Sequence, residues 1–269
     1  MALIKSSSLR SSGTDPADLM SEVTACLEEA FSYRGGFLRI GGSDKSLEVG
    51  QWWLRETSDA SAPLSDRVER ELVKILIERP RSSLLEIIQE LCNIFPGLLT
   101  PSTELIQVCL ESYAEQAPPE SGHWQLRDQD APQARRADLV QIQNLLAEMA
   151  IQMGYSPHGE GPLLWHDKNG ELRYAFYVLA SAIISDVVFT REYPPEQCLV
   201  IIPGGRANLV AYKIHHDPRL RQAVETGWRF VKYRQLRRLA ESPLLISEAL
   251  DDHFSQDELT LDTPQLHLF

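Results

Sequence analysis

The chain has 269 residues, of which 43% are apolar, and it carries a formal net charge of −12 at pH 7. The length predicts two domains, and the net charge excludes a wholly basic nucleic-acid binder. No stretch approaches the roughly 18 unbroken apolar residues of a membrane helix, so we expect a cytoplasmic protein with no membrane contact. The four cysteines are far apart and form no CxxC pair, which favours buried thiols over metal ligands.

Changes in composition predict four segments. Residues 1–20 are Ser-rich and lack the apolar core of a secretory signal, so we expect a loose arm. A helical domain is predicted over 21–130, and an α/β domain over 131–241, divided at a Pro-rich polar break near Ala131. Residues 242–269 read as an acidic tail.

The helical domain begins with a predicted helix over 19–31 and a short strand over Phe37–Ile40, which paired glycines place in a hairpin. The adjacent Trp52 and Trp53 could stack on a ligand, but a small satellite core is the simpler interpretation.

Three predicted helices follow, with Ser65 and Thr100 as expected N-caps of the first and third, and a short strand comes after them. The helices span 63–80, 82–97 and 100–116, and the strand spans 123–127. This order is winged-helix-like. The third helix carries Glu104, Glu111 and Glu115 and no Lys or Arg, so we expect protein contact or a structural role there, not insertion into a DNA groove.

The α/β domain opens with a long amphipathic helix, and the hydrophobic period then changes to that of strands. Asn169 and Gly170 predict a hairpin turn between its first two strands. The expected order is a helix over 133–155, strands over 163–166 and 172–179, a helix over 180–189, a strand over 198–203, a helix over 205–216, a strand over 228–232 and a helix over 233–241. This order predicts an α/β sandwich with a mixed sheet.

Cations are concentrated from Pro203 to Leu239, a segment with nine Lys or Arg and only two acids. The rest of the chain therefore has a net charge of −19. Arg206 and Lys213 lie two helical turns apart, on one flank of the helix that follows a Pro-Gly-Gly turn. Free amides, the helix dipole and two cations suit a phosphate. The alternative is a tight turn with solvated charges. The candidate phosphate-binding residues are Gly204, Gly205, Arg206, Lys213, Arg219, Arg221, Lys232, Arg234 and Arg237.

An ordered series of short motifs resembles the carboxy-terminal accessory region of large bacterial adenine-specific DNA methylases. The motifs are "WWLRE" (52–56), "PLSDRVE" (63–69), "CLESY" (109–113) and "IIPGGRANLVAYKIHHDPRL" (201–220). The resemblance covers roughly residues 30–240. It implies that the second domain is similar to the restriction-endonuclease-like fold.

In that fold a β-hairpin normally carries the acids that bind a metal ion. The matching positions here are Pro162, Tyr177 and Leu179, and none of them can bind a metal. The "YPPE" at 193–196 also lacks the amide or carboxylate of a methylase motif. We therefore expect no catalytic residue, no metal and no cofactor.

The sequence thus predicts a catalytically silent accessory protein of a bacterial DNA-modification or anti-phage system, which docks on the DNA backbone, on a partner enzyme or on both. One alternative is an active metal-dependent nuclease whose acids have moved to Asp167, Glu171 and Asp186. The other is a protein-binding scaffold whose acidic first domain recruits a basic partner.

Overall fold

The structure is a computed structural model that describes residues 25, 37–40, 51–54, 62–159, 161–190, 192–241, 250–254 and 259. The chain divides into two units, residues 1–61 and 62–269.

The first unit contains an antiparallel pair of strands, β1 (Phe37–Ile40) and β2 (Gln51–Leu54), in which Phe37 pairs with Leu54. The expected strand at Phe37–Ile40 is therefore confirmed. The predicted helix over 19–31 lies outside the described residues except for residue 25, and the side chains of Trp52 and Trp53 lie outside them as well.

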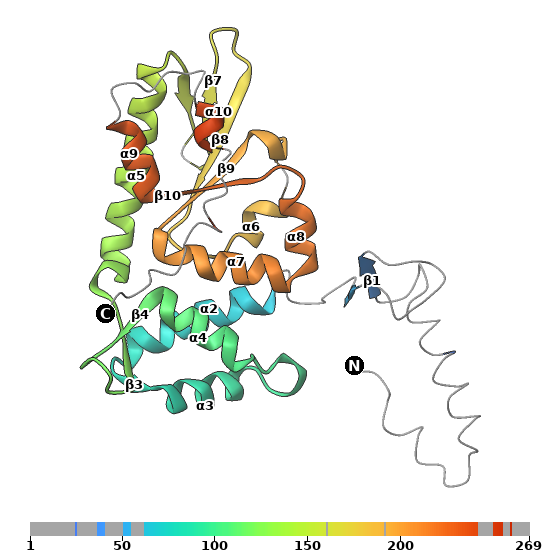
Figure 1. The fold of residues 1–269 in the computed structure, drawn as a ribbon, viewed down its shortest axis with the longest axis vertical. Helices are drawn as coiled ribbons and strands as arrows, with labels where there is room; N and C mark the ends of the chain where they lie inside the picture. Colours follow the sequence, from blue (N-terminus) through green and yellow to red (C-terminus); the bar gives the residue numbers. More distant parts are fainter. Residues whose placement is uncertain are drawn as a thin grey trace, which may run out of the picture. The chain divides into compact units, whose positions relative to one another are not determined.

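The second unit begins with a helical region, drawn in cyan to green in Figure 1. Its elements are α2 (Leu64–Glu78), β3 (Ser82–Ser83), α3 (Leu84–Ile94), η1 (Gly97–Leu99), α4 (Thr103–Tyr113), β4 (Ala114–Gln116), β5 (His123–Leu126) and η2 (Asp128–Asp130). The three strands form a small antiparallel sheet in the order β3-β5-β4. The three helices agree with the amphipathic pattern of the sequence.

Two of the expected helix caps differ from the structure. Helix α2 already begins at Leu64 and has no side-chain cap, so Ser65 lies inside it. Helix α4 begins at Thr103, and its cap is Ser102, whose hydroxyl accepts a hydrogen bond from the Leu105 amide at 3.2 Å. Thr100 is instead the residue that ends η1. Thr100 therefore does not cap α4.

The α/β region of the second unit follows directly. Its elements are α5 (Pro132–Gln152), β6 (Ser156–His158), β7 (Leu163–His166), β8 (Leu172–Val178), α6 (Ser185–Val188), η3 (Pro195–Gln197), β9 (Cys198–Ile202), η4 (Gly204–Arg206), α7 (Ala207–His216), α8 (Pro218–Val224), β10 (Arg229–Lys232), α9 (Tyr233–Ala240) and α10 (Leu250–Phe254). The five-stranded sheet has the order β10-β9-β8-β7-β6. Strands β8, β9 and β10 are parallel, and β6, β7 and β8 are antiparallel, so the predicted α/β class with a mixed sheet is confirmed.

Several details of this region differ from expectation. The helix predicted over 180–189 is limited to α6, because residues 180–184 form an irregular, bent segment instead. Strand β6 and helix α8 were not expected. Part of the predicted acidic tail forms α10, whose Leu250 and Phe254 are buried.

The sheet separates two hydrophobic clusters. Helices α5, α9 and α10 cover one face, and the sheet residues Tyr174, Phe176 and Ile201 pack in the same cluster as these helices. The opposite face contributes Ala175 and Val200 to a cluster that also contains the helical region and α7. Alternating side chains of β8 and β9 therefore enter different clusters, as expected for strands covered on both faces.

Helix α7 lies between the sheet and the helical region, next to α4 (Figure 1). Its Leu209 and Val210 belong to the cluster that also includes Leu72 and Leu110 of the helical region. The parts before and after residue 131 therefore share a core. That they are separable domains stays a prediction.

Candidate functional site

The Pro-Gly-Gly turn lies between β9 and α7, with its two glycines in η4, and it lies directly against the carboxyl end of α4. A Cβ on Gly205 would lie 3.5 Å from the Ser112 carbonyl oxygen and 3.6 Å from an Arg127 nitrogen. The turn therefore faces protein on this side. Gly204 is half-buried and Gly205 is exposed.

Arg206 is buried, with 0% of its surface exposed. Its guanidinium forms an ion pair with Asp130 and donates hydrogen bonds to the carbonyl oxygens of Ser112 and, at 3.3 Å, Ala180. It also lies 3.4 Å from the centre of the Tyr113 ring. These contacts join η2, α4 and the segment after β8 around one cation.

Lys213 is 1% exposed and lies within α7. Its ammonium group donates to Asp66 at 2.5 Å, to Glu69, and to the Ala182 carbonyl oxygen at 3.0 Å. An ammonium has three N–H donors, so every donor of Lys213 has an acceptor.

The two carboxylates beside Lys213 are also held by other donors. The Ser185 hydroxyl donates to Asp66, and the Tyr113 hydroxyl donates to Glu69. The Ala182 amide donates to Glu69 Oε1 at 2.8 Å. We call these side chains, together with Arg206 and Asp130, the buried ion network: Asp66, Glu69, Tyr113, Asp130, Ser185, Arg206 and Lys213.

Electrostatics fix the protonation of the network. Burial by itself lowers the pKa of Lys213, but the charges of Glu69 and Asp66 outweigh it and hold that pKa above its usual value. Burial and the charge of Glu69 raise the pKa of Tyr113 well above its usual value, and they also raise the pKa of the nearby Cys109 thiol. The lysine is therefore charged, and the phenol and thiol are neutral and poor nucleophiles.

The network joins the helical and α/β regions and offers no open reaction site. Asp66 and Glu69 belong to α2, Tyr113 to α4, and Lys213 to α7. Desolvation offsets most of the attraction in buried ion pairs, whereas removal of a single partner costs about 3–5 kcal/mol. The intact pairs between α7 and α2 therefore add little to stability, whereas the loss of either partner would leave an uncompensated buried charge.

The burial of Arg206 and Lys213 bears directly on the expected phosphate site. Both cations are paired with carboxylates inside the second unit, so in this structure neither presents a face to an external phosphate. Arg206 lies in η4, directly before α7, and Lys213 lies within α7, and both side chains face the helical region instead of solvent.

The other cations of the basic segment are scattered. Arg219 pairs with Asp217 at 3.1 Å, and Arg221 donates to the His215 carbonyl oxygen. Lys232 is buried at the end of β10. Arg234 is exposed on α9.

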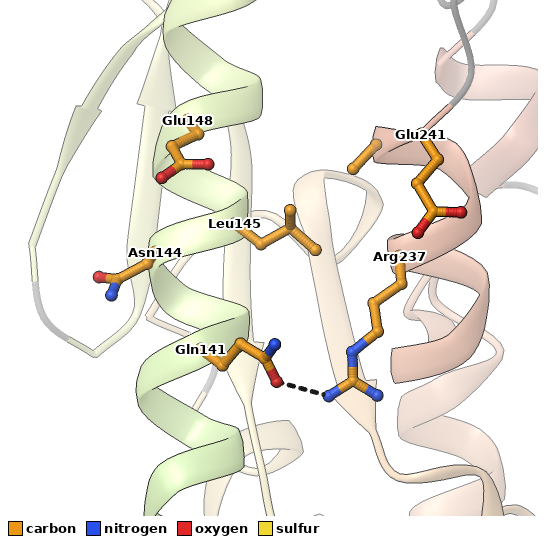
Figure 2. A pocket seen from close by; sticks show the side chains of 7 residues that line it. Gln141, Asn144, Leu145, Glu148, Arg237 and Glu241 are labelled. Carbon is orange, nitrogen blue, oxygen red and sulfur yellow. Dashed lines mark hydrogen bonds between the residues drawn. The ribbon is translucent and has the colours of Figure 1, made fainter.

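Arg237 lies beside a groove of about 410 Å³ between α5 and α9. It bonds to Asp138 at 3.3 Å and to the Gln141 side chain at 3.0 Å. Figure 2 shows this second bond, with Leu145 pointing from α5 towards α9. The groove is lined by Gln141, Asn144, Leu145, Glu148, Arg237, Ala240 and Glu241.

The β7–β8 hairpin is the place where a nuclease-like fold would carry metal ligands. Pro162 precedes β7, and the buried Tyr177 packs against Trp228 with ring centres 5.6 Å apart. Leu179 follows β8, and its amide donates to the Ile201 carbonyl oxygen at 2.9 Å. These positions present no carboxylate.

Two of the three acids of the alternative nuclease hypothesis, Asp167 and Asp186, interact with other groups of the chain. Asp167 accepts hydrogen bonds from the amides of Asn169 and Glu171 in the hairpin turn. Asp186 pairs with Arg70 at 2.9 Å on the surface. In the part of the chain that the structure describes, no three His, Cys, Asp or Glu side chains gather as a metal site, and no helix is long and apolar enough to cross a membrane.

The sequence did not identify Asp66, Glu69, Asp130 or Tyr113 as site residues. A signal was nevertheless present, because three of the four motifs of the methylase resemblance supply five of the seven network residues, and only Asp130 and Ser185 lie outside them. "PLSDRVE" contains Asp66 and Glu69, "CLESY" contains Tyr113, and the segment after β9 contains Arg206 and Lys213. Motifs far apart in sequence thus meet at one buried place.

Comparison with known proteins finds no significant similarity. No family model matches the sequence, and neither a curated protein nor a solved structure matches it significantly.

Proposed function

We propose that the chain is a catalytically silent accessory protein of a bacterial DNA-modification or anti-phage system, which docks on the DNA backbone, on a partner enzyme or on both. The observation that carries the proposal is the β7–β8 hairpin. Its matching positions hold Pro162, Tyr177 and Leu179, which offer a metal ion no carboxylate.

Two features of the fold support the domain types in this proposal. Helices α2, α3 and α4 are followed by the β4–β5 hairpin, with β3 completing the small sheet, which suits a winged-helix-like unit. The mixed sheet between two helical layers suits a nuclease-like scaffold. Three of the motif segments on which the resemblance rests meet in the buried ion network.

Helix α4 is not the docking element that we propose. It packs beside α7, and its Leu105, Ile106 and Leu110 are buried. Its exposed edge carries Glu104 and Glu111, which repel phosphates.

The arginines of α9 are better placed to meet a DNA backbone. Arg234 and Arg238 are exposed and lie four residues apart, so they share one face of the helix, and the partly exposed Arg237 lies next to them. We call Arg234, Arg237 and Arg238 the α9 surface. Contacts of this kind recognise charge and carry no base sequence information.

The test is the salt dependence of duplex binding. The double variant Arg234→Ala/Arg238→Ala should bind more weakly, and each lost phosphate contact should lower the log–log salt slope by about 0.9. The matched control is Lys74→Ala/Arg79→Ala, which removes two exposed cations from the helical region and should leave the slope unchanged.

Other outcomes would favour the alternatives. Equal slopes in the two double variants would contradict docking through the α9 surface. Absence of binding at low salt would favour the protein scaffold, for which the exposed Glu104, Glu111 and Glu115 are the specific observation. Cleavage in Mg²⁺ or Mn²⁺ that Asp167→Ala abolishes would favour the nuclease.

A further inference from the structure

Two histidines lie side by side on neighbouring strands at the edge of the large sheet. Strands β6 and β7 are antiparallel, and Ser156 pairs with His166. His158 is two residues from Ser156, so its side chain lies on the same face as that of His166. The two imidazole rings have centres 5.4 Å apart and planes inclined by 60°.

This separation suits two ligands of one metal ion. With a metal–nitrogen bond of about 2.0–2.1 Å, a ring centre lies about 3.2 Å from the metal, so two imidazoles at a tetrahedral angle have centres about 5.2 Å apart. The observed separation of 5.4 Å is close to this value.

The hydrogen bonding of His166 supports a ligand at this place. Its Nδ1 is buried and has no hydrogen-bond partner among the described residues. Buried nitrogens without a partner are uncommon in folded proteins, and a bound ion or water is one of their usual causes. His158 is exposed, so an ion can approach from solvent.

Each histidine is followed by a residue with a constrained backbone. Directly after His158, Gly159 has a φ of +86°, and a Cβ there would come within 2.6 Å of the Pro162 carbonyl oxygen. Directly after His166, Asp167 closes the β7–β8 turn by accepting two backbone hydrogen bonds. The β7–β8 turn therefore holds the strand end that carries His166, which limits the entropy lost when an ion binds.

We propose that His158 and His166 form a two-histidine site for a divalent transition-metal ion, with water molecules completing the coordination. Imidazole nitrogens suit Zn²⁺, Ni²⁺ and Cu²⁺, with Cu²⁺ bound most tightly, whereas Mg²⁺ and Ca²⁺ prefer oxygen ligands. The site is independent of the proposed function, because it lies outside the positions that match nuclease ligands.

A second pair of rings provides the control. His215 and His216 at the end of α7 have ring centres 5.0 Å apart, so ring distance alone does not distinguish the two pairs. However, His216 Nδ1 lies 2.8 Å from the Tyr212 carbonyl oxygen, and its ring stacks on Tyr212. Adjacent residues on a helix also point about 100° apart.

The experiment is a calorimetric titration of the full chain with Cu²⁺ and with Zn²⁺, repeated for His158→Ala, His166→Ala and His215→Ala/His216→Ala. We expect one site in the unchanged chain, at least tenfold weaker binding in each strand variant, and unchanged binding in the α7 variant. Because His158 is exposed on an edge strand, its variant should keep the fold, which circular dichroism checks.

Electron paramagnetic resonance of the Cu²⁺ complex provides a second readout. It should show two coupled nitrogens in the unchanged chain and in the α7 variant, and at most one in each strand variant. The absence of binding in the unchanged chain, unchanged binding in His158→Ala, or loss of binding in the α7 variant would each overturn the proposal. Mg²⁺ should give no heat at the same concentrations.

Discussion

The two faces of the large sheet are covered in different ways. On one face, rings of Trp165, Tyr174, Phe176 and Phe254 pack against one another, with the centres of Trp165 and Phe176 4.6 Å apart. On the other face, α7 packs on the sheet and also carries Lys213 into the buried ion network. The apolar burial on the first face is favourable but non-directional. On the second face, the paired charges between α7 and α2 require specific positions of their partners.

The substitution Lys213→Met should have the largest effect. It leaves Asp66 and Glu69 buried without their cation, so we expect the free energy of unfolding to fall by about 3–5 kcal/mol. Urea unfolding followed by circular dichroism measures this loss. A loss below about 1 kcal/mol would show that the two carboxylates do not depend on the lysine.

Alkaline pH should lower the stability of the sheet face that carries Tyr174 and the other aromatic rings. Burial, and then the hydrogen bond to Asp251, raise the pKa of Tyr174 to about 12. The tyrosine of the unfolded chain ionises near pH 10. The contribution of Tyr174 to the free energy of unfolding is therefore fully present below about pH 10, and it falls by roughly 1.4 kcal/mol per pH unit between about pH 10 and 12.

The variant Tyr174→Phe checks this dependence. Because it lacks the hydroxyl, its free energy of unfolding should be about 1 kcal/mol lower at pH 8. Above pH 10 this free energy should decline less steeply than in the unchanged chain. The measurement is the free energy of unfolding between pH 8 and 11.5. An equally steep decline would mean that other groups dominate there.

The sequence predicted the elements of the two faces better than the contacts between them. Apolar periodicity identified α2, α3 and α5, Asn169 and Gly170 marked the β7–β8 turn, and the apolar run identified β9. These signals are local, and they report which side of an element is apolar.

The network residues give no such signal, because Lys213 and Asp66 are 147 residues apart in sequence. A charged flank on an amphipathic helix usually faces solvent, and α7 departs from that rule because the helical region covers its second side. The carboxylates of α2 likewise look like ordinary surface acids in the sequence.

The smallest effect should come from an exposed pair between α2 and α6, the helices that also carry Asp66 and Ser185. Arg70 and Asp186 are 2.9 Å apart, with 49% and 61% of their side chains exposed. Such pairs contribute about 0–1 kcal/mol, so Arg70→Ala should change the unfolding free energy by less than 1 kcal/mol and should respond to salt. A change as large as that of Lys213→Met would remove the distinction between buried and exposed pairs.

A double-mutant cycle tests the central claim, that Lys213 acts as the internal counter-ion of Asp66 and Glu69. The cycle compares the unchanged chain, Lys213→Met, Asp66→Asn/Glu69→Gln and the triple variant. The amides keep oxygen acceptors for Ser185, Tyr113 and the Ala182 amide while removing the charge. We predict that the triple variant loses less free energy of unfolding than the sum of the losses in Lys213→Met and in Asp66→Asn/Glu69→Gln. The difference, which is the coupling energy, should be about 2–3 kcal/mol. Losses that simply add would contradict the account.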